Sequence, residues 1–476
     1  MAAGNDGSKN RPAIDFSEEF ARFAATVEVK DLAPEVVEAA KANIFDTMAC
    51  AAGGISGAGV RDLAGLVADW GGKPEASVWF TDIRVPAPMA AWVNGMMSHA
   101  RDFDDTLDAA TLHAGVSVIP AAVAAAETAP EATGEDLIAG VAVGLELISR
   151  LGLATRVGII ESGYMYTSLF GHFAATAAAA RVMRLDAAQT RNALGIAYSQ
   201  AAGNHQVTRD AALTKRIQPG FAAKTGLISV AMSKLGIRGA QMTFEGVDGL
   251  FRTYLHDRYD PERLRQGLGS QFEFAALSYK PYPCCRFNHT AIDAALVLRE
   301  KLGGDLSDIR AIRVGVNNQS YEAVCTPPEM RRAPKTIVQA QFSIPYTFAT
   351  ALVTGGVNLN DLSDEALNRP DVLALAAKTE CRVDLGIEAD WPRAVSPADV
   401  EIETVRGTFS MRVDYPKGHP DAPMSERDFD MKMEGCLAAS GLAWPEDTVR
   451  RFRTRVDGLA QARRGAEILD VFVMRK

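Results

Sequence analysis

The segment from Ser98 to Thr106 concentrates charged and polar side chains between two apolar stretches with helical character. It contains His99 and three aspartates within four positions, and a second histidine, His113, follows it. Carboxylates in an apolar setting lose much of their solvation, so they are usually paired, bound to a ligand or engaged in proton transfer. A solvent-exposed acidic helix N-terminus would contain the same residue types. The segment therefore predicts either a site for binding and proton transfer or a solvated helix end.

Two further clusters carry positive charge. Lys215 follows Thr214 in the run Leu-Thr-Lys-Arg, and Lys280 and Arg286 bracket the run Lys-Pro-Tyr-Pro-Cys-Cys-Arg. Lysine and arginine hold carboxylates, and the planar guanidinium can do so with two parallel hydrogen bonds. One acidic and two cationic clusters together favour a site for a small anionic molecule over a solvated helix end.

Composition restricts the class of protein. The chain has 476 residues, of which 47% are hydrophobic and 23% charged, as is typical of globular proteins with two or three domains. A net charge of −9 without a basic stripe argues against a nucleic-acid partner. The first dozen residues are polar, which indicates a tail and not a signal peptide, and no apolar run predicts a membrane span. We expect a cytoplasmic protein with no nucleic-acid or membrane partner.

The six cysteines have no spacing typical of zinc or iron–sulfur ligands, and they do not form a disulfide framework. The neighbouring Cys284 and Cys285 are interpreted as packing residues beside a proline turn, not as nucleophiles. Glycine-rich nucleotide loops and the H-E-x-x-H and G-x-S-x-G motifs are also absent from the sequence. The prediction is an enzyme without a metal or another cofactor.

One alternative uses magnesium. Residues 104–108 spell D-D-x-x-D, the pattern with which all-helical isoprenoid synthases hold magnesium and diphosphate. Those enzymes bind metal from both walls of the pocket, and no second acidic metal motif follows downstream. The magnesium-dependent synthase is therefore the weaker hypothesis.

Hydrophobic periodicity predicts a mainly α fold. Helical spacing dominates from about residue 14 to 268, for example over 34–54, 136–153 and 187–202, and returns at 425–440 and 445–459. Strand-like alternation is scarce before Ile309 and then occurs at 312–316, 381–385, 400–405 and 409–413. We predict a large all-helical domain formed by residues 1–276 and 418–476, with a smaller inserted α+β lid domain at 277–417. A cleft between two such domains is a common place for a small ligand.

Five ordered segments resemble motifs of the MmgE/PrpD family. The chain is similar to this family at His99–Thr106 with His113–Gly115, Thr167–Gly171, Leu213–Lys215 with Pro219–Ala223, Lys280–Arg286 with His289, and Gln341–Tyr346. The family includes 2-methylcitrate dehydratase, cis-aconitate decarboxylase and iminodisuccinate epimerase. The resemblance implies a homodimer with a helical domain and an α+β lid, which makes or breaks a C–H bond beside a carboxylate without metal.

The resemblance also implies roles for individual residues. Lys215 is expected to carry a proton or anchor a carboxylate, with His113 as the acid or base and Asp102 orienting one of these two. The chain departs from the family pattern at Met165, where many members have a histidine. Tyr166 is the candidate to replace that histidine as an acid. The residues predicted to contact the substrate are Thr106, Thr214, Lys280, Arg286, His99 and Met165.

These residues predict a metal-independent lyase acting on a small di- or tricarboxylate by α-proton abstraction, foremost a hydro-lyase similar to 2-methylcitrate dehydratase. The missing histidine keeps two alternatives open: an epimerase of an iminodisuccinate-like amino-dicarboxylate, and a carboxy-lyase similar to cis-aconitate decarboxylase. A catalytically inactive binding protein that retains the cleft is a further hypothesis from a different class.

Overall fold

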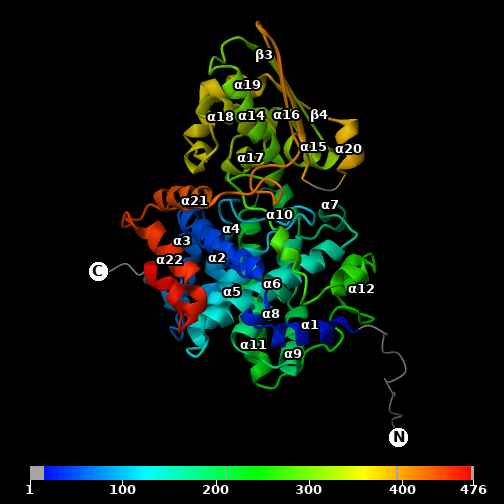
Figure 1. The fold of residues 1–476 in the computed structure, drawn as a ribbon, viewed down its shortest axis with the longest axis vertical. Coiled ribbons are helices and arrows are strands. Elements are labelled where there is room, and N and C mark those ends of the chain that lie inside the picture. The colour runs from blue at the N-terminus through cyan, green and yellow to red at the C-terminus, as the bar shows by residue number, and fades with distance from the viewer. Residues whose placement is uncertain (1–14, 211, 393–394, 473–476) are drawn as a thin grey trace.

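The computed structural model describes residues 15–210, 212–392 and 395–472, so the polar tail predicted at 1–12 lies outside the described residues. The prediction of a mainly helical chain is confirmed. Figure 1 shows a large helical body that carries a smaller part with the main sheet. A minor pair of two-residue strands, β1 (Ala76–Ser77) and β2 (Arg84–Val85), also lies in the helical body.

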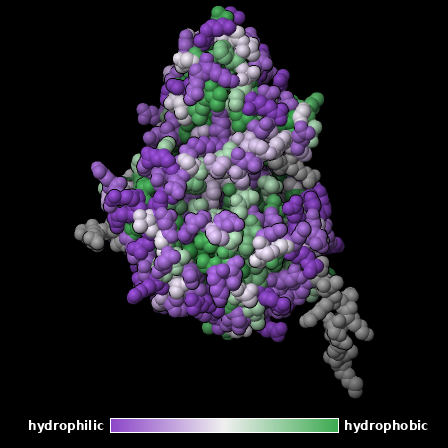
Figure 2. Space-filling view, in the orientation of Figure 1, coloured by the Kyte–Doolittle hydropathy of each residue, from purple (hydrophilic) through white to green (hydrophobic). Residues whose placement is uncertain are grey.

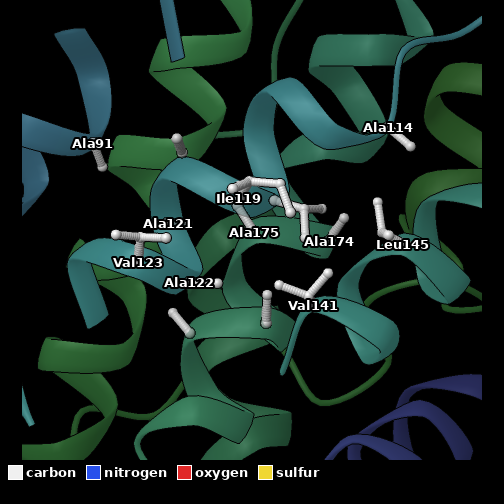
Figure 3. Close-up of a cluster of buried hydrophobic side chains, with 14 of the residues drawn as sticks. Ala91, Ala114, Ile119, Ala121, Ala122, Val123, Val141, Leu145, Ala174 and Ala175 are labelled. Atoms are coloured by element: carbon white, nitrogen blue, oxygen red, sulfur yellow. The ribbon is translucent and has the colours of Figure 1, made fainter. Parts of the chain in front are cut away.

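The helical body is built around six helices that pack on one another. These are α2 (Pro34–Gly54), α4 (Ala87–His99), α5 (Gly115–Thr128), α6 (Gly134–Ala154), α8 (Tyr166–Val182) and α11 (Thr214–Lys234). Alanines dominate their contacts; Figure 3 shows Ala121, Ala122, Ala174 and Ala175 among the larger Ile119, Val141 and Leu145. Small side chains let helix axes approach closely, and these alanines are buried in the core.

Shorter helices surround this core. They are α1 (Phe16–Thr26), α3 (Val60–Trp70), α7 (Ile159–Ser162), α9 (Ala187–Tyr198), α10 (Gln206–Arg209), α12 (Leu250–Leu255) and α13 (Pro261–Arg265). The chain returns to the body through α21 (Glu426–Ala439) and α22 (Thr448–Asp457), which both pack on α2.

Helix α6 is long and apolar enough to cross a membrane, although the sequence analysis predicted no such run. It lies in the middle of the helical body, where 94% of its most apolar window is buried by protein. Its interior also holds a buried ion pair, with Arg150 Nε 2.5 Å from Glu146 Oε1. These are the properties of a central core helix.

The main sheet has the strand order β4-β3-β5-β6. The central strand β3 (Ile309–Val316) is parallel to β4 (Thr379–Val383) and antiparallel to β5 (Ala398–Thr404), which forms a hairpin with β6 (Gly407–Val413). Residues of β5 alternate between buried and partly exposed, so one face of this strand meets the core. Helices α14 (His289–Lys301) and α18 (Ile344–Thr354) pack on each other, and α14 covers β5 and β6. The other helices here are α15 (Asn318–Val324), α16 (Pro328–Arg332), α17 (Ile337–Gln341), α19 (Pro370–Ala377) and α20 (Leu385–Asp390).

Buried hydrophobic residues form two separate clusters. The larger cluster takes its members from Phe16–Leu277 and Met433–Phe472, and the smaller one from Tyr282–Ile402. We refer to the part around the smaller cluster, residues 282–413, as the sheet region. The domain boundaries predicted at 277 and 417 stay a prediction. In Figure 2 both parts show a largely hydrophilic surface on the face in view.

The crossing of α4 and α11 depends on two glycines. A Cβ at Gly220 would lie 2.2 Å from the backbone oxygen of Trp92, and one at Gly95 would lie 2.7 Å from the Cα of Gly220. The two backbones therefore touch, as only glycine allows. Because His99 ends α4 and Lys215 lies in the first turn of α11, this crossing brings the acidic and the first cationic cluster together.

We predict that Gly220→Ala destabilises the protein by about 1–3 kcal/mol, since the new methyl group must push two backbones apart. The matched control is Gly65→Ala in α3, where a Cβ would meet no atom within 4 Å. Removing a glycine from a helix interior there should stabilise the protein by roughly 0.5–1 kcal/mol. Urea unfolding of both variants measures the difference, and equal effects would contradict the tight crossing.

Candidate active site

A cavity of about 280 Å³ lies between the helical body and the sheet region. Seven of the residues predicted for the site border it, namely Asp102, Thr106, His113, Met165, Lys215, Lys280 and Arg286. They come from the loop after α4, the start of α8, the start of α11 and the segment that enters the sheet region. The structure thus brings the acidic cluster and both cationic clusters to a single cavity.

Asp102 bridges the two lysines. Its Oδ2 lies 2.9 Å from Nζ of Lys215, and its Oδ1 lies 2.5 Å from Nζ of Lys280, which also donates to the Asp102 carbonyl. Although burial raises the pKa of Asp102, the two ammonium groups hold it well below its usual range. The backbone of Asp102 has φ of +52°, a conformation that non-glycine residues seldom adopt. A strained residue retained between two buried cations is typical of a functional site.

Asp104 holds both histidines. Its Oδ2 lies 2.8 Å from Nδ1 of His99 and 2.9 Å from Nδ1 of His113. Nδ1 of His113 is also 2.8 Å from the carbonyl oxygen of Asp105, so both neighbours of this nitrogen are acceptors and it must carry the proton. In its neutral form, His113 therefore has a lone pair on Nε2, for which the described part of the chain provides no donor, as a general base requires.

His99 connects this pair to Lys215. Its Nδ1 donates to Asp104, and its Nε2 accepts a hydrogen bond of 3.3 Å from Nζ of Lys215. Burial lowers the pKa of His99 to about 4, with the charge of Lys215 acting in the same direction. A neutral His99 thus accepts from a charged Lys215, and a continuous chain of hydrogen bonds links His113 to Lys280 through Asp104, His99, Lys215 and Asp102.

The three aspartates of the D-D-x-x-D pattern have different partners. Asp104 binds the histidines, whereas Asp105 accepts from the backbone N–H groups of Ala114 and Gly115 at the start of α5. Asp108 accepts from Thr106, Ser278 and Arg286. Because the carboxylates do not converge, the arrangement argues against the magnesium-dependent synthase.

Ligand atoms of His99, Asp104 and His113 lie within 4.8 Å of one another, a spacing that a metal ion could use. Both Nδ1 atoms already donate to the carboxylate, and the ammonium of Lys215 lies beside the remaining nitrogen of His99. A cation at that place would face this positive charge at short range. The geometry fits a hydrogen-bonded triad better than a metal centre.

Arg286 is held at two of its three nitrogens. Nε donates to Asp108 at 3.2 Å and Nη1 to the carbonyl of Lys417 at 2.9 Å, while the buried Nη2 has no partner in the part of the chain described. The Arg286 side chain borders the cavity, and guanidinium groups commonly bind carboxylates, although its Nη2 is sealed from solvent in this arrangement.

Cys285 borders the cavity and Cys284 lies behind it. Burial raises the pKa of both thiols, to about 11 for Cys285. Neither thiol is therefore activated as a nucleophile, in agreement with their interpretation as packing residues.

Two models of protein-family domains match the chain. The model of the MmgE/PrpD N-terminal domain matches residues 18–262, and that of the C-terminal domain matches residues 282–456. The chain belongs to the MmgE/PrpD family. The resemblance found in the sequence is thus confirmed. The family's C-terminal domain extends beyond the boundary predicted at 417 and includes α21 and part of α22.

Relatives in the MmgE/PrpD family include named decarboxylases. A cis-aconitate decarboxylase-like protein of Aspergillus oryzae is 28% identical over 88% of this chain and 90% of its own length. The human cis-aconitate decarboxylase is 27% identical over 91% of this chain and 89% of its own. The cis-aconitate decarboxylase of Aspergillus terreus is 27% identical over 86% of each chain.

Three residues predicted for the site do not border the cavity. The hydroxyl of Tyr166 donates to the carbonyl of Val157 at 2.7 Å, and burial raises the pKa of this phenol, so it is a poor replacement for the family histidine. Thr214 is exposed at the start of α11. His99 is buried behind Lys215 and acts on it through a hydrogen bond, not on a ligand.

Two residues have other roles than the sequence analysis expected. Asp102 orients Lys215, but it is Asp104, which was not among the predicted site residues, that orients His113. The ammonium group of Lys280, predicted to contact the substrate, donates two hydrogen bonds to Asp102.

The cavity also includes residues that were not predicted for the site, among them Thr111, His205, Thr208 and Arg331. Thr167 and Phe342 border it too, and both belong to segments that resemble family motifs. For His205, the available signal was a histidine ten positions before Lys215, in the segment that follows the helix predicted over 187–202.

We predict that acid destabilises the protein through its buried histidines. Burial lowers the pKa of His99 and of His172, which lies outside the cavity, from 6.5 to about 4. Between these values the unfolded chain binds more protons than the folded one, so stability present above pH 6.5 is lost as the pH falls toward 4. Each histidine accounts for a loss of at most about 1.4 kcal/mol in the free energy of unfolding per pH unit.

Urea unfolding at pH 7 and pH 5 measures this loss. The variant His172→Gln should lose less stability than the wild type over this interval, by about 2 kcal/mol at most. An equal loss in both proteins would contradict a neutral buried His172.

Proposed function

We propose that this protein is a metal-independent lyase that acts on a small di- or tricarboxylate and begins by removing a proton from the carbon beside a carboxylate. The observation that carries the proposal is the cavity in which a histidine with a free Nε2 lone pair, His113, faces the same space as the ammonium of Lys215. A base and a proton donor at one cavity are what an elimination requires.

The cations have separate tasks in this proposal. Arg286, which borders the cavity, would hold one substrate carboxylate, and Lys215 would stabilise the negative charge that develops as the C–H bond breaks. Asp102 keeps Lys215 in place through a hydrogen bond of 2.9 Å, and Lys280 in turn holds the other oxygen of Asp102. All of these groups are buried or nearly so, and low solvent access strengthens their action on the substrate.

The first candidate reaction is dehydration. The proton on the α carbon passes to Nε2 of His113, the C–H electron pair forms the C=C bond, and the C–O bond at the β carbon breaks. Lys215 donates a proton to the departing hydroxyl, which leaves as water.

The second candidate reaction is decarboxylation, which the names of the relatives favour, since three of them from different species are cis-aconitate decarboxylases or similar to them. The same cationic groups would hold the substrate. The C–C bond to one carboxylate would break with release of CO₂, and its electron pair would form a C–H bond with a proton from Lys215, so this route forms a C–H bond and does not begin by breaking one. Epimerisation uses the same proton abstraction without loss of a group.

Incubation in D₂O with 2-methylcitrate, citrate, cis-aconitate and iminodisuccinate distinguishes these reactions by NMR. A new alkene indicates dehydration, release of CO₂ with deuterium in the product indicates decarboxylation, and deuterium in an otherwise unchanged acid indicates epimerisation. Binding of an acid without any exchange or product would contradict an enzyme and favour the inactive binding protein.

We predict that Lys215→Ala lowers kcat/KM for the accepted acid by about 10²–10⁴-fold, because it removes both the proton donor and the charge. The matched control is Lys234→Ala, which removes an exposed lysine from the last turn of the same helix and should leave kcat/KM unchanged. If the Lys215 variant keeps most of its rate, the assignment of the site is wrong.

A further inference from the structure

A second histidine borders the cavity from a separate segment of the chain. His205 precedes the short helix α10, and it shares the cavity with His113, Lys215 and Met165. Thr208 of α10 donates to the sulfur of Met165 at 3.7 Å, so α10 packs directly on the residue that stands where many family members have a histidine.

The backbone around His205 is tied to the elements that carry the site. Its N–H donates to the carbonyl of Gly163, just before Met165, at 2.8 Å. The side-chain amide of Gln218 on α11 makes two hydrogen bonds to the backbone of Asn204, of 2.8 and 3.1 Å. Because Gln218 lies one helical turn after Lys215, it fixes the position of His205 relative to Lys215.

The two ring nitrogens of His205 have different surroundings. Nδ1 is sealed from solvent and has no hydrogen-bond partner among the described residues. A proton on Nδ1 would therefore be a buried donor without an acceptor, which is rarer and costlier in proteins than an unpaired acceptor. The ring thus carries its proton on Nε2, the nitrogen left to meet a ligand in the cavity.

The same geometry disfavours the charged ring. An imidazolium would protonate Nδ1 as well, and burial together with the charges of Arg209 and Lys215 lowers the pKa of His205. His205 is therefore a neutral N–H donor to the cavity, whereas the acceptors around Nδ1 of His113 leave the lone pair of that ring on Nε2.

We propose that His205 is a further catalytic residue, which donates a hydrogen bond from Nε2 to the substrate oxygen on which negative charge develops. The inference rests on the proposed function and adds a second imidazole to it. His113 accepts the proton from the substrate, whereas His205 stabilises the substrate oxygen and transfers no proton. A neutral imidazole is suited to this task because it gains no charge and needs no proton return.

Three substitutions separate this role from proton transfer. The amide nitrogen of glutamine reaches the place of the histidine Nε2, whereas that of asparagine reaches only the place of Nδ1. We expect His205→Gln to keep kcat/KM within about tenfold of the wild type, and His205→Asn and His205→Phe to lose about 10²–10³-fold. The control His256→Asn changes an exposed histidine after α12 and should have no effect.

Equal losses in the glutamine and phenylalanine variants would overturn the inference, because only a group that transfers protons cannot be replaced by an amide. Full activity of all three variants would overturn it as well. A wild type that turns over none of the four acids would contradict the proposed function, and then ¹⁵N NMR of the histidine rings in the unliganded protein still decides the tautomer. The inference requires a proton on Nε2 of His205 and none on Nδ1; the reverse would overturn it.

Discussion

The arrangement of this site depends on one buried carboxylate. Asp102 lies between the ammonium groups of Lys215 and Lys280, and without it both lysines would be uncompensated charges in a nearly dry interior. Removing one partner of a buried pair commonly costs 3–5 kcal/mol, so the position of Asp102 determines where the others can lie. Since Lys215 belongs to the helical body and Lys280 to the entry of the sheet region, this carboxylate also joins the two walls of the cavity.

Around this carboxylate, hydrogen bonds determine which groups carry protons. Asp104 accepts from both His99 and His113, which leaves one ring with its lone pair toward Lys215 and the other with its lone pair free. Identical side chains thereby acquire different chemistry. The difference arises from the acceptors that surround each nitrogen and not from the residue type.

The success of sequence reasoning varied with the range of the interactions involved. Local signals predicted the helix at 34–54 to the residue, and the strands at 312–316 and 400–405 to within three residues of β3 and within two of β5. The clusters around Asp102, Lys215 and Arg286 were also recognisable, because several ordered motifs identify the family more specifically than one motif can. Adjacency to Met165 in the sequence does not determine the direction of Tyr166: at the start of α8 its hydroxyl donates to the carbonyl of Val157.

By itself, the sequence determined the helical character of the chain, the family and the residue types from which the site is built, since periodicity and motifs are properties of short segments. Only the tertiary structure decided that Asp104 holds the histidines, that Thr214 points to solvent and that His205 reaches the cavity. Those assignments depend on contacts between residues far apart in the chain, such as the approach of α4 to α11 at Gly95 and Gly220. The physical reason is that protonation state and orientation follow from the partners that packing supplies, and no local pattern encodes them.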